Sequence, residues 1–556
     1  MKPVMYLSLF LAFIIMGCSP KESPKDPTES SNSIESSDVV LGKLEHGFTL
    51  SPGTQEKFDE GLLLLHNFEY DDALSAFEEA TALDSTEVLT HWGEAMCHYK
   101  ALWRLQNTED GRAVISRLGE TREERLAAID SPIEKAMWEI VEIMYGEGEF
   151  KTRNNLIKDH LAAMHKKFPN HQEIAAFYAL SLVWATEAYG DGSADLRLAA
   201  SIADKVIKVN PLHPGALHYK IHALDGPTSA EDALDAADVY AKVAADAAHA
   251  LHMPSHIYLA IGEWEGVVNS NQRSYDASVK RMVDKELDDG ARGYHSLAWL
   301  HYGLLQQGKY GKAEEVLKEI LTYGPKDPTK RARGYLIGMQ SRQLAETGKV
   351  NEQTQLELDV DVDDIGIIAK SVRSLLRAQI AFQNEDLETI NDEIDWLSTS
   401  IFMDSLTIKD SGIAMCAAGN TRYAPTENSV KVAQVNLTQI EGLKALLQEN
   451  QKLFEVKMKK AVELENLTNF PTGPPAITKP SFEQYGEWLL ENGRYEEAKT
   501  QFDKALLRMP KRSKSLKGKV TALKALNQLD EVEEIEKELQ SIYAQADAEV
   551  KKFMEE

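Results

Sequence analysis

A group of histidines with helical spacing contains the residues of this sequence best suited to chemistry. His218 and His222 are four residues apart, and His252 and His256 repeat that spacing 34 residues later. His249 lies three residues before His252. Imidazoles four residues apart on a helix lie on one face and can share a metal ion, and imidazole suits zinc, copper, iron and nickel. The spacing therefore predicts a transition-metal site, with zinc or copper as the expected ion.

The 34-residue interval also indicates which elements position these side chains. It equals the period of a tetratricopeptide repeat, a unit of two packed helices. In such repeats, positions 2, 5 and 9 of the first helix line the concave face, and they span an arc of roughly 60°. Units starting at Pro214, Ala248 and Tyr294 bring the following histidines to these positions: His218, His222, His249, His252, His256 and His295.

Small residues and an aromatic residue recur at fixed intervals elsewhere in the chain. Intervals of 12, 4 and 3 separate Gly61, Ala73, Phe77 and Ala80, and the same intervals separate Gly486, Ala498, Phe502 and Ala505. Gly308, Tyr310, Ala313 and Pro325 are spaced as Gly493, Tyr495, Ala498 and Pro510 are. This pattern predicts an all-α superhelix of tetratricopeptide-type hairpins, an α-solenoid, from about Gly47 to the C-terminus.

The N-terminus reads as a lipoprotein signal. Lys2 precedes an apolar run from Val4 to Met16, which is too short to span a bilayer as a helix. The following Ile15-Met16-Gly17-Cys18 resembles a bacterial lipobox, so we expect lipidation of Cys18. An ordinary secretory signal or a chance cysteine is the alternative. Because Ser19 is not an acidic retention signal, the expected location is the outer membrane, facing the periplasm or the cell surface.

Composition and spacing divide the chain into five parts. We expect a signal peptide and lipobox over residues 1–18, followed by a disordered tether over 19–46. Residues 47–346 are predicted to form a repeat superhelix with a histidine-rich groove, and 347–468 a set of degenerate helical repeats. Residues 469–556 begin with a proline-rich joint and continue as C-terminal repeats and a cap. Cys97 and Cys416 are expected to be free and buried rather than bridged.

The charge and the motifs narrow the classes of function. A net charge of −27 argues against nucleic acid as a partner, because binding phosphates needs a basic face. The sequence contains no Walker loop, GxGxxG, GxSxG or HExxH motif. An enzyme stays possible, since Glu94, Asp225 or Asp246 could supply a carboxylate, although the sequence does not bring them beside the histidines.

Several segments together resemble bacterial tetratricopeptide proteins of about this length. They include HWGEAMC, HPGALHYKIHALD, ALHMPSHIYLAIG and KPSFEQYGEWLLENGRYEEA, with the HYxxH and HMPSH histidine motifs among them. The resemblance spans most of residues 55–530 and implies a fold but no reaction. A histidine common in those proteins is replaced here by Ala298. Lipid-anchored helical proteins that capture glycans are a rival resemblance, but their long Asn-, Gly- and aromatic-rich loops are not found here.

Three interpretations of the histidine stripe stay open at this point. The rings could be structural, or they could recognise a protein or peptide together with Tyr219, Tyr258 and Glu94, or they could bind metal. The fold favours a membrane-anchored, non-enzymatic scaffold whose concave groove holds a protein or peptide partner, although a fold is a weak guide to function. The metal interpretation predicts that at least three ring nitrogens lie within roughly 5 Å of a common point.

Overall fold

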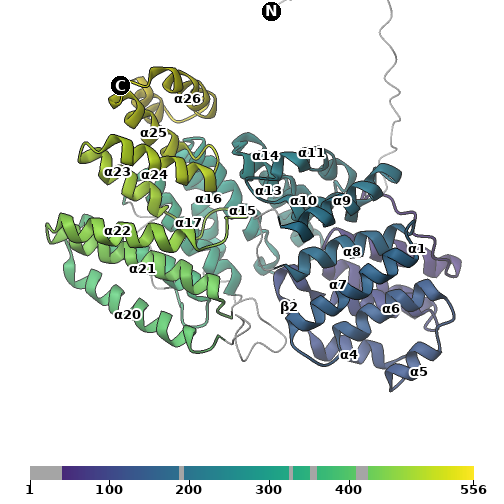
Figure 1. Ribbon diagram of the computed structural model, residues 1–556. Coiled ribbons are helices and arrows are strands. Elements are labelled where there is room, and N and C mark those ends of the chain that lie inside the picture. Colours follow the sequence, from purple (N-terminus) through teal and green to yellow (C-terminus); the bar gives the residue numbers. More distant parts are fainter. Residues whose placement is uncertain (1–39, 187–192, 325–329, 351–359, 409–423, 556) are drawn as a thin grey trace, which may run out of the picture. The chain divides into compact units, whose positions relative to one another are not determined.

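The N-terminal part of the chain is a succession of helices that pack on their sequence neighbours (Figure 1). The computed structural model describes residues 40–186, 193–324, 330–350, 360–408 and 424–555. The first helices are α1 (Pro52–His66), α2 (Tyr70–Leu83), α3 (Val88–Cys97), α4 (Thr108–Ser116), α5 (Arg122–Ala127), α6 (Pro132–Met144), α7 (Phe150–Lys167), α8 (Gln172–Ala185) and α9 (Ala194–Val209). Among the described residues, the strand pair β1 (Tyr99–Lys100) and β2 (Leu105–Gln106), joined by the short 3-10 helix η1 (Ala101–Trp103), is the only sheet.

The middle of the chain carries the histidines. Its helices are α10 (Pro214–Leu224), η2 (Ala230–Ala233), α11 (Leu234–Val243), α12 (Ala248–His252), α13 (Pro254–Ile261), α14 (Trp264–Asp284), η3 (Asp289–Ala291), α15 (Tyr294–Gln306), α16 (Tyr310–Tyr323) and α17 (Lys330–Thr347). Figure 1 shows α10, α11, α13 and α14 side by side, and each packs on the next in this series. The three predicted unit starts coincide with the first residues of α10, α12 and α15.

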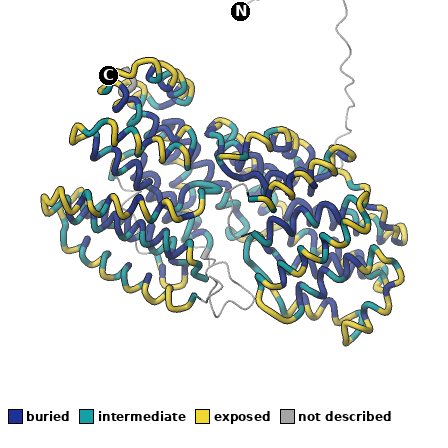
Figure 2. The backbone as a smooth tube through the Cα atoms, in the orientation of Figure 1, coloured by how far each residue is buried: buried dark blue, intermediate teal, exposed yellow. Residues whose placement is uncertain are grey.

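The C-terminal part continues in the same all-helical manner. Its helices are α19 (Ile367–Gln383), α20 (Leu387–Ser405), α21 (Glu427–Leu447), α22 (Gln451–Asn466), α23 (Ser481–Glu491), α24 (Tyr495–Arg508), α25 (Ser513–Ala525), α26 (Leu529–Ile542) and α27 (Ala548–Glu555). Most of these helices bury one side and expose the other, so that buried and exposed segments alternate along the backbone in Figure 2. The longest continuous core extends from Leu41 to Ala260.

The small residues of the repeat pattern let neighbouring helices pack closely around an aromatic ring. A Cβ atom added at Gly61 or Gly93 would lie 2.8 or 2.4 Å from the ring of Phe77. In the C-terminal repeats, a Cβ at Gly486 or Gly518 would meet the ring of Phe502 at 2.9 or 2.2 Å. Each aromatic ring therefore fills the space between two repeats, which requires glycine on both flanking helices. The predicted all-α tetratricopeptide-type solenoid is confirmed.

The predicted tether ends earlier than expected. Residues 40–46 are ordered against the repeats: Lys43 N donates to Leu212 O (2.9 Å), and Leu41 is buried. The serine- and proline-rich composition ends at about residue 38, so this short segment has apolar side chains to bury. The predicted signal, the rest of the tether and Cys416 lie outside the described residues, while Cys97 is free and buried as expected.

Two further features bear on the site. Residues 469–480 form no helix, and Arg342 donates from Nη2 to the carbonyl oxygens of Pro474 and Pro475 at 3.3 and 3.2 Å. The proline-rich joint is thus packed on α17 rather than acting only as a connection.

Within the described residues, no helix combines the length and apolar character needed to cross a membrane.

Candidate metal centre

The histidines converge because α10 is buried nearly all round and α13 packs directly on it. Pro254 begins α13 immediately after α12, so the second pair of histidines is shared between two short, nearly continuous helices. Helix α14 packs against α12, α13 and α15 and joins them into one unit. The side chains come from four helices: His218 and His222 from α10, His249 and His252 from α12, His256 from α13, and His295 from α15.

The six rings form two neighbouring groups. In each group, one nitrogen from every ring lies within 4.8 Å of the other two. We name them the first triad, which consists of His218, His222 and His249, and the second triad, which consists of His252, His256 and His295. The ring centroids of the two triads approach to 5.8 Å at His222 and His256. The array is therefore one continuous cluster of imidazoles with two centres.

This grouping differs from the single stripe expected from sequence. The sequence placed His249, His252 and His256 on one face, but seven residues of helix between the first and the last correspond to about 10.5 Å along the axis. That distance is too long for rings on one side of a helix to share an ion. His249 instead turns to α10 and joins the first triad, and His295 completes the second.

The outward nitrogens of the second triad are held by hydrogen-bond acceptors. His252 Nδ1 lies 2.6 Å from Asn271 Oδ1, and Asn271 Nδ2 donates to Val267 O, which identifies Oδ1 as the acceptor. His256 Nδ1 lies 2.6 Å from Asp225 Oδ2, a carboxylate oxygen that also accepts. Both Nδ1 atoms are therefore donors, and in the neutral ring the Nε2 atom then carries a lone pair.

In their neutral forms, His252 and His256 consequently face each other through Nε2 atoms that carry no proton. His252 Nε2 lies 3.0 Å from His256 Nε2 and 3.0 Å from His295 Nε2. One added proton could bridge only one of these contacts, whereas a metal ion accepts all three lone pairs. Burial, followed by the charges of His295 and His256, holds the pKa of His252 well below its ordinary value, which disfavours the proton.

Three of the nitrogen–nitrogen distances are close to those of tetrahedral coordination. Nitrogens bound to zinc at about 2.0–2.1 Å lie about 3.3–3.4 Å from one another in a tetrahedron. The contacts of 3.0 Å in the second triad and 3.2 Å between His218 Nε2 and His249 Nε2 in the first are close to this value. Three protein ligands leave the fourth position open, as in zinc sites that bind water or substrate.

The first triad is built in the same way but lies in an aromatic environment. His218 Nδ1 lies 2.7 Å from the carbonyl oxygen of His66, so it is the donor and its Nε2 points toward His249. His222 Nε2 is buried and has no hydrogen-bond partner among the described residues. Burial lowers the pKa of His218 to about 3, and Phe68 stacks on the rings of His222 and His249. This triad therefore presents neutral imidazoles in a dry setting.

A third cluster, of His66, Glu173 and His213, is arranged differently. His66 Nε2 lies 2.7 Å from Glu173 and its Nδ1 lies 2.8 Å from Tyr219 Oη, so both of its nitrogens already have partners. Although burial raises the pKa of Glu173, the charges of His66 and His213 bring it well below its usual value. This cluster is a buried hydrogen-bond network around Glu173, and it holds the residue His66 whose carbonyl oxygen orients the first triad.

Two of the three residues predicted to line an open groove are fully buried. Tyr219 is fully buried and contacts His66. Glu94 is also fully buried, and it accepts from Thr81 and Arg117, outside the two triads. These corrections share a cause, since both side chains point into the packing between helices. Tyr258 is half-buried, and its hydroxyl donates to Asp238 rather than to a histidine.

The residues that orient the second triad could only partly be found from sequence. Asp225 stood out as an acidic residue near the histidines, and the structure brings it to His256. Asn271 and Tyr335, which contact His252 and His295, carried no sequence signal because α14 and α17 follow no histidine spacing. Trp299 packs on His256 at a centroid distance of 4.5 Å and lies one helical turn after His295, a spacing that could have indicated it.

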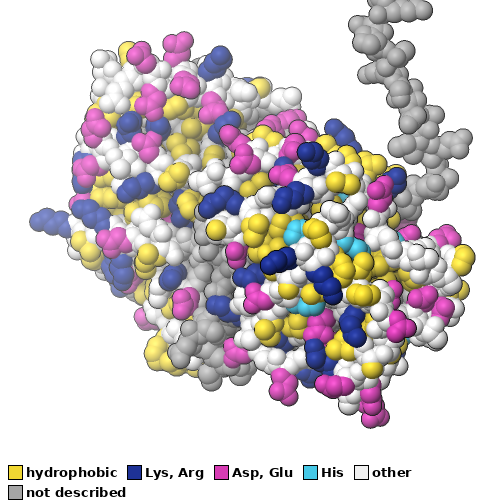
Figure 3. All heavy atoms as spheres, turned by 45° about the vertical axis from the view of Figure 1, so that its right-hand side comes forward, with side chains coloured by type: hydrophobic (Ala, Val, Ile, Leu, Met, Phe, Trp, Pro, Cys, Tyr) yellow, Lys and Arg dark blue, Asp and Glu magenta, His cyan; other side chains and the backbone are white. Residues whose placement is uncertain are grey.

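The exposed surface shows histidine only sparsely. Figure 3 shows acidic and basic side chains interspersed over the face in view, with histidine in small patches. His218 and His252 are 0% and 1% exposed, whereas His222, His249 and His295 are half-buried.

Comparisons with known proteins give structural likeness alone. No family model matches the chain, and no curated protein matches it. Among solved structures, the tetratricopeptide domain of P58(IPK) aligns with 13% identity over 86% of this chain and 99% of that one, with a TM-score of 0.22. Yeast Tom70 aligns with 13% identity over 86% and 96%, with a TM-score of 0.31, and the human IFIT1 dimer with 13% over 90% of each and 0.30. Values this low say nothing about function.

Proposed function

We propose that this protein binds two transition-metal ions, one in each histidine triad. The observation that carries the proposal is the contact of 3.0 Å between His252 Nε2 and His256 Nε2, two atoms that both present lone pairs. Buried polar atoms are normally satisfied, and unsatisfied ones need an explanation. A bound cation supplies that explanation for all three nitrogens of the triad, and in metal sites the distal nitrogen is commonly held by an acceptor, as it is here.

The ligand set also indicates the kind of ion. Three imidazoles with no thiolate suit zinc, copper, iron or nickel rather than calcium or magnesium, which prefer oxygen. The carboxylate of Asp225 raises the basicity of His256 and favours a divalent ion in the second triad. Zinc and copper are the ions we would test first.

Elemental analysis of variants tests this function. The protein is produced without a histidine tag and purified without chelator, and its metal content is measured per chain. We expect two equivalents in the wild type and about one in His222→Leu or His256→Leu. His165→Leu is the matched control, because His165 also carries a buried, unpartnered nitrogen but lies outside both triads. Equal metal content in all variants, or none in the wild type, would contradict the proposal.

The location is proposed from the N-terminal sequence. Lipidation of Cys18 would anchor the protein in the outer membrane, with its body facing the periplasm or the cell surface. From the HYxxH and HMPSH motifs, we propose that the protein belongs with the bacterial tetratricopeptide lipoproteins. Release of Cys18→Ser into the soluble fraction, against a membrane-bound wild type, is the expected result of cell fractionation.

A second candidate function is the partner-binding scaffold expected from the repeat architecture. Its surface would lie away from the buried triads. The end of α20 exposes three large apolar side chains, Phe402, Met403 and Leu406, to 60%, 56% and 61%. Loss of a specific envelope partner on changing Phe402 and Leu406 to serine, with retention in His222→Leu, would favour this role.

A further inference from the structure

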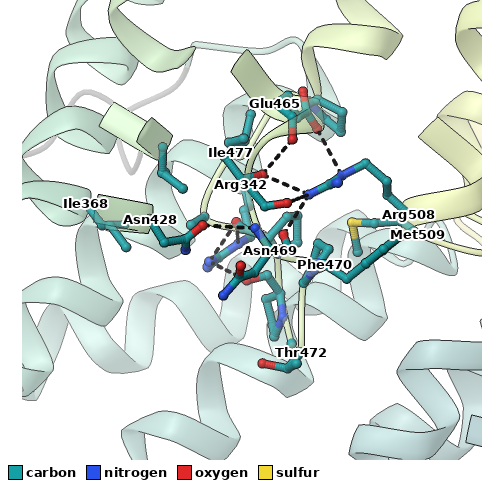
Figure 4. A pocket seen from close by; sticks show the side chains of 18 of the residues that line it. Arg342, Ile368, Asn428, Glu465, Asn469, Phe470, Thr472, Ile477, Arg508 and Met509 are labelled. Atoms are coloured by element: carbon teal, nitrogen blue, oxygen red, sulfur yellow. Dashed lines mark hydrogen bonds and ion pairs between the residues drawn. The ribbon is translucent and has the colours of Figure 1, made fainter. Parts of the chain in front are cut away.

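A cavity of about 370 Å³ adjoins the second triad. It is bounded by α15, α17, the start of α21, the proline-rich segment 469–480 and the end of α24. Its volume falls at the lower end of the range for small-molecule sites, about 300–1,000 Å³. Figure 4 shows side chains from these separate elements around it. The cavity is therefore large enough for a small ligand and is formed by segments far apart in sequence.

The cavity reaches the proposed metal centre through two residues. His295, whose Nε2 lies 3.0 Å from His252 Nε2, is part of the cavity wall. Trp299 is also part of the wall, and its ring packs on both His252 and His256 at 4.8 and 4.5 Å. A molecule in the cavity would therefore contact His295, a proposed ligand of the second triad, and Trp299, which covers the other two rings.

Two arginines give the cavity a positive character. Arg342 donates to the carbonyl oxygens of Pro474 and Pro475, and Arg508 donates from Nη2 to Thr468 and Asn469. All of these acceptors are uncharged main-chain or hydroxyl oxygens. Both arginine side chains are about nine-tenths buried. A buried guanidinium ordinarily needs an anion, and neutral carbonyls compensate its charge only in part.

The nearby carboxylate is already engaged. Glu465 accepts from Ser481 N at 2.7 Å and from the hydroxyl of the same residue, and its other oxygen lies 3.9 Å from Arg508 Nε. Arg508 Nε has no hydrogen-bond partner among the described residues. Burial lowers the pKa of Arg342 to about 10 and also lowers that of Arg508. Figure 4 shows Arg508 extending toward Glu465 along the cavity wall.

Apolar side chains form another part of the lining. Phe470 lies against the guanidinium of Arg508 at 5.0 Å from the ring centroid, and Ile368, Ile477 and Met509 form further parts of the wall. A ligand suited to these surroundings combines one anionic group with an apolar body. An inorganic anion would leave the apolar walls unused, and a neutral hydrocarbon would leave the arginines uncompensated.

We infer that this cavity binds a small organic carboxylate, with its anionic group at Arg508 and Arg342 and its body lying along Trp299 toward the second triad. The placement of the ligand body near a bound metal rests on the proposed function, whereas recognition of the carboxylate by Arg508 and Arg342 does not. A carboxylate bound in this way would lie against His295, the one ring of the second triad that is part of the cavity wall.

Calorimetric titration with 3-phenylpropionate and its neutral amide tests the inference. The full chain is used in a chelator-treated form and in a form loaded with Co²⁺. We expect the carboxylate to bind both forms and the amide to bind at least tenfold more weakly. Arg508→Gln should reduce carboxylate binding at least tenfold, and Arg508→Lys should restore part of it. Arg494→Gln, an arginine paired with Glu497 away from the cavity, is the control and should change nothing.

The outcomes separate this inference from the proposed function. Carboxylate-selective binding to the chelated protein, without any metal uptake, would support the arginine site while refuting the metal proposal. A change in the visible spectrum of bound Co²⁺ on adding the carboxylate would support the approach to the second triad. Equal binding of carboxylate and amide, or full affinity in a folded Arg508→Gln variant, would overturn the inference even if both metals bind. Equal melting temperatures establish that the variants are folded.

Discussion

Replacing Asp225 by asparagine should weaken metal binding at the second triad alone. The carboxylate holds His256 Nδ1 at 2.6 Å and is 7% exposed, so little solvent screens it. Asparagine retains an oxygen acceptor of the same shape and removes only the charge. From the lengths of the ring and its two contacts, the charge lies about 6–7 Å from the ion. With an effective dielectric constant of about 20, its attraction to a divalent ion has a ceiling of about 5 kcal/mol.

The measured loss should be smaller, because the hydrogen bond is retained. Changes to residues that hold a metal-binding histidine typically reduce affinity 10- to 100-fold, or about 1.4–2.8 kcal/mol. Competition against a chromophoric chelator resolves the two sites, and the first triad serves as an internal reference. Asp246→Asn is the matched control, since this aspartate accepts from Val40 N rather than from a histidine. An equal loss at both sites, or less than a twofold loss at the second, would refute the reasoning.

Three other predictions follow from burial and packing. Burial lowers the pKa values of His218 and His301 to about 3, whereas histidines of the unfolded chain take up protons near pH 6.5. The metal-free protein should therefore lose stability as the pH falls from 6.5 toward 3. Urea unfolding at pH 7.5 and 5.0 measures this loss, and equal unfolding midpoints would contradict it. Phe77→Ala should cost about 3–5 kcal/mol, because the ring fills the space between Gly61 and Gly93, and a loss below 1 kcal/mol would be inconsistent with that packing. Gly215→Ala should weaken metal binding at the first triad. The added Cβ would lie 2.2 Å from His66 Nδ1 and displace the His66 carbonyl oxygen that orients His218. Unchanged metal affinity at the first triad would argue against this role of His66.

Much of the fold could be predicted because tetratricopeptide packing depends on a few residues at fixed spacing. Phe77 and Phe502 fill the gaps that their flanking glycines leave, and the sequence contains both halves of this arrangement. The unit starts at Pro214, Ala248 and Tyr294 followed from the same period. Residues 40–46 were assigned wrongly because a short apolar segment next to a disordered composition gives little signal.

The site was less accessible from sequence, because helical spacing gives the angle between side chains but not their partners. The histidines could be identified as a set, yet the division into two triads depends on the axial separation of His249 and His256 and on how α12 meets α10. Asn271, Tyr335 and Arg342 come from helices that carry no repeat of the histidine pattern. Such tertiary contacts arise only when the superhelix forms, so one sequence cannot specify them.

X-ray absorption spectroscopy of the gently purified, tag-free protein tests the central claim most directly. The account predicts stoichiometric metal, with a first shell dominated by nitrogen at about 2.0–2.1 Å and the outer-shell scattering of three imidazoles per ion. The spectrum of His256→Leu should retain the imidazole scattering of the first triad while the metal content falls by one equivalent. A shell dominated by oxygen or sulfur, or a protein that holds no stoichiometric metal after exposure to zinc and copper, would contradict the assignment of the two triads as metal centres.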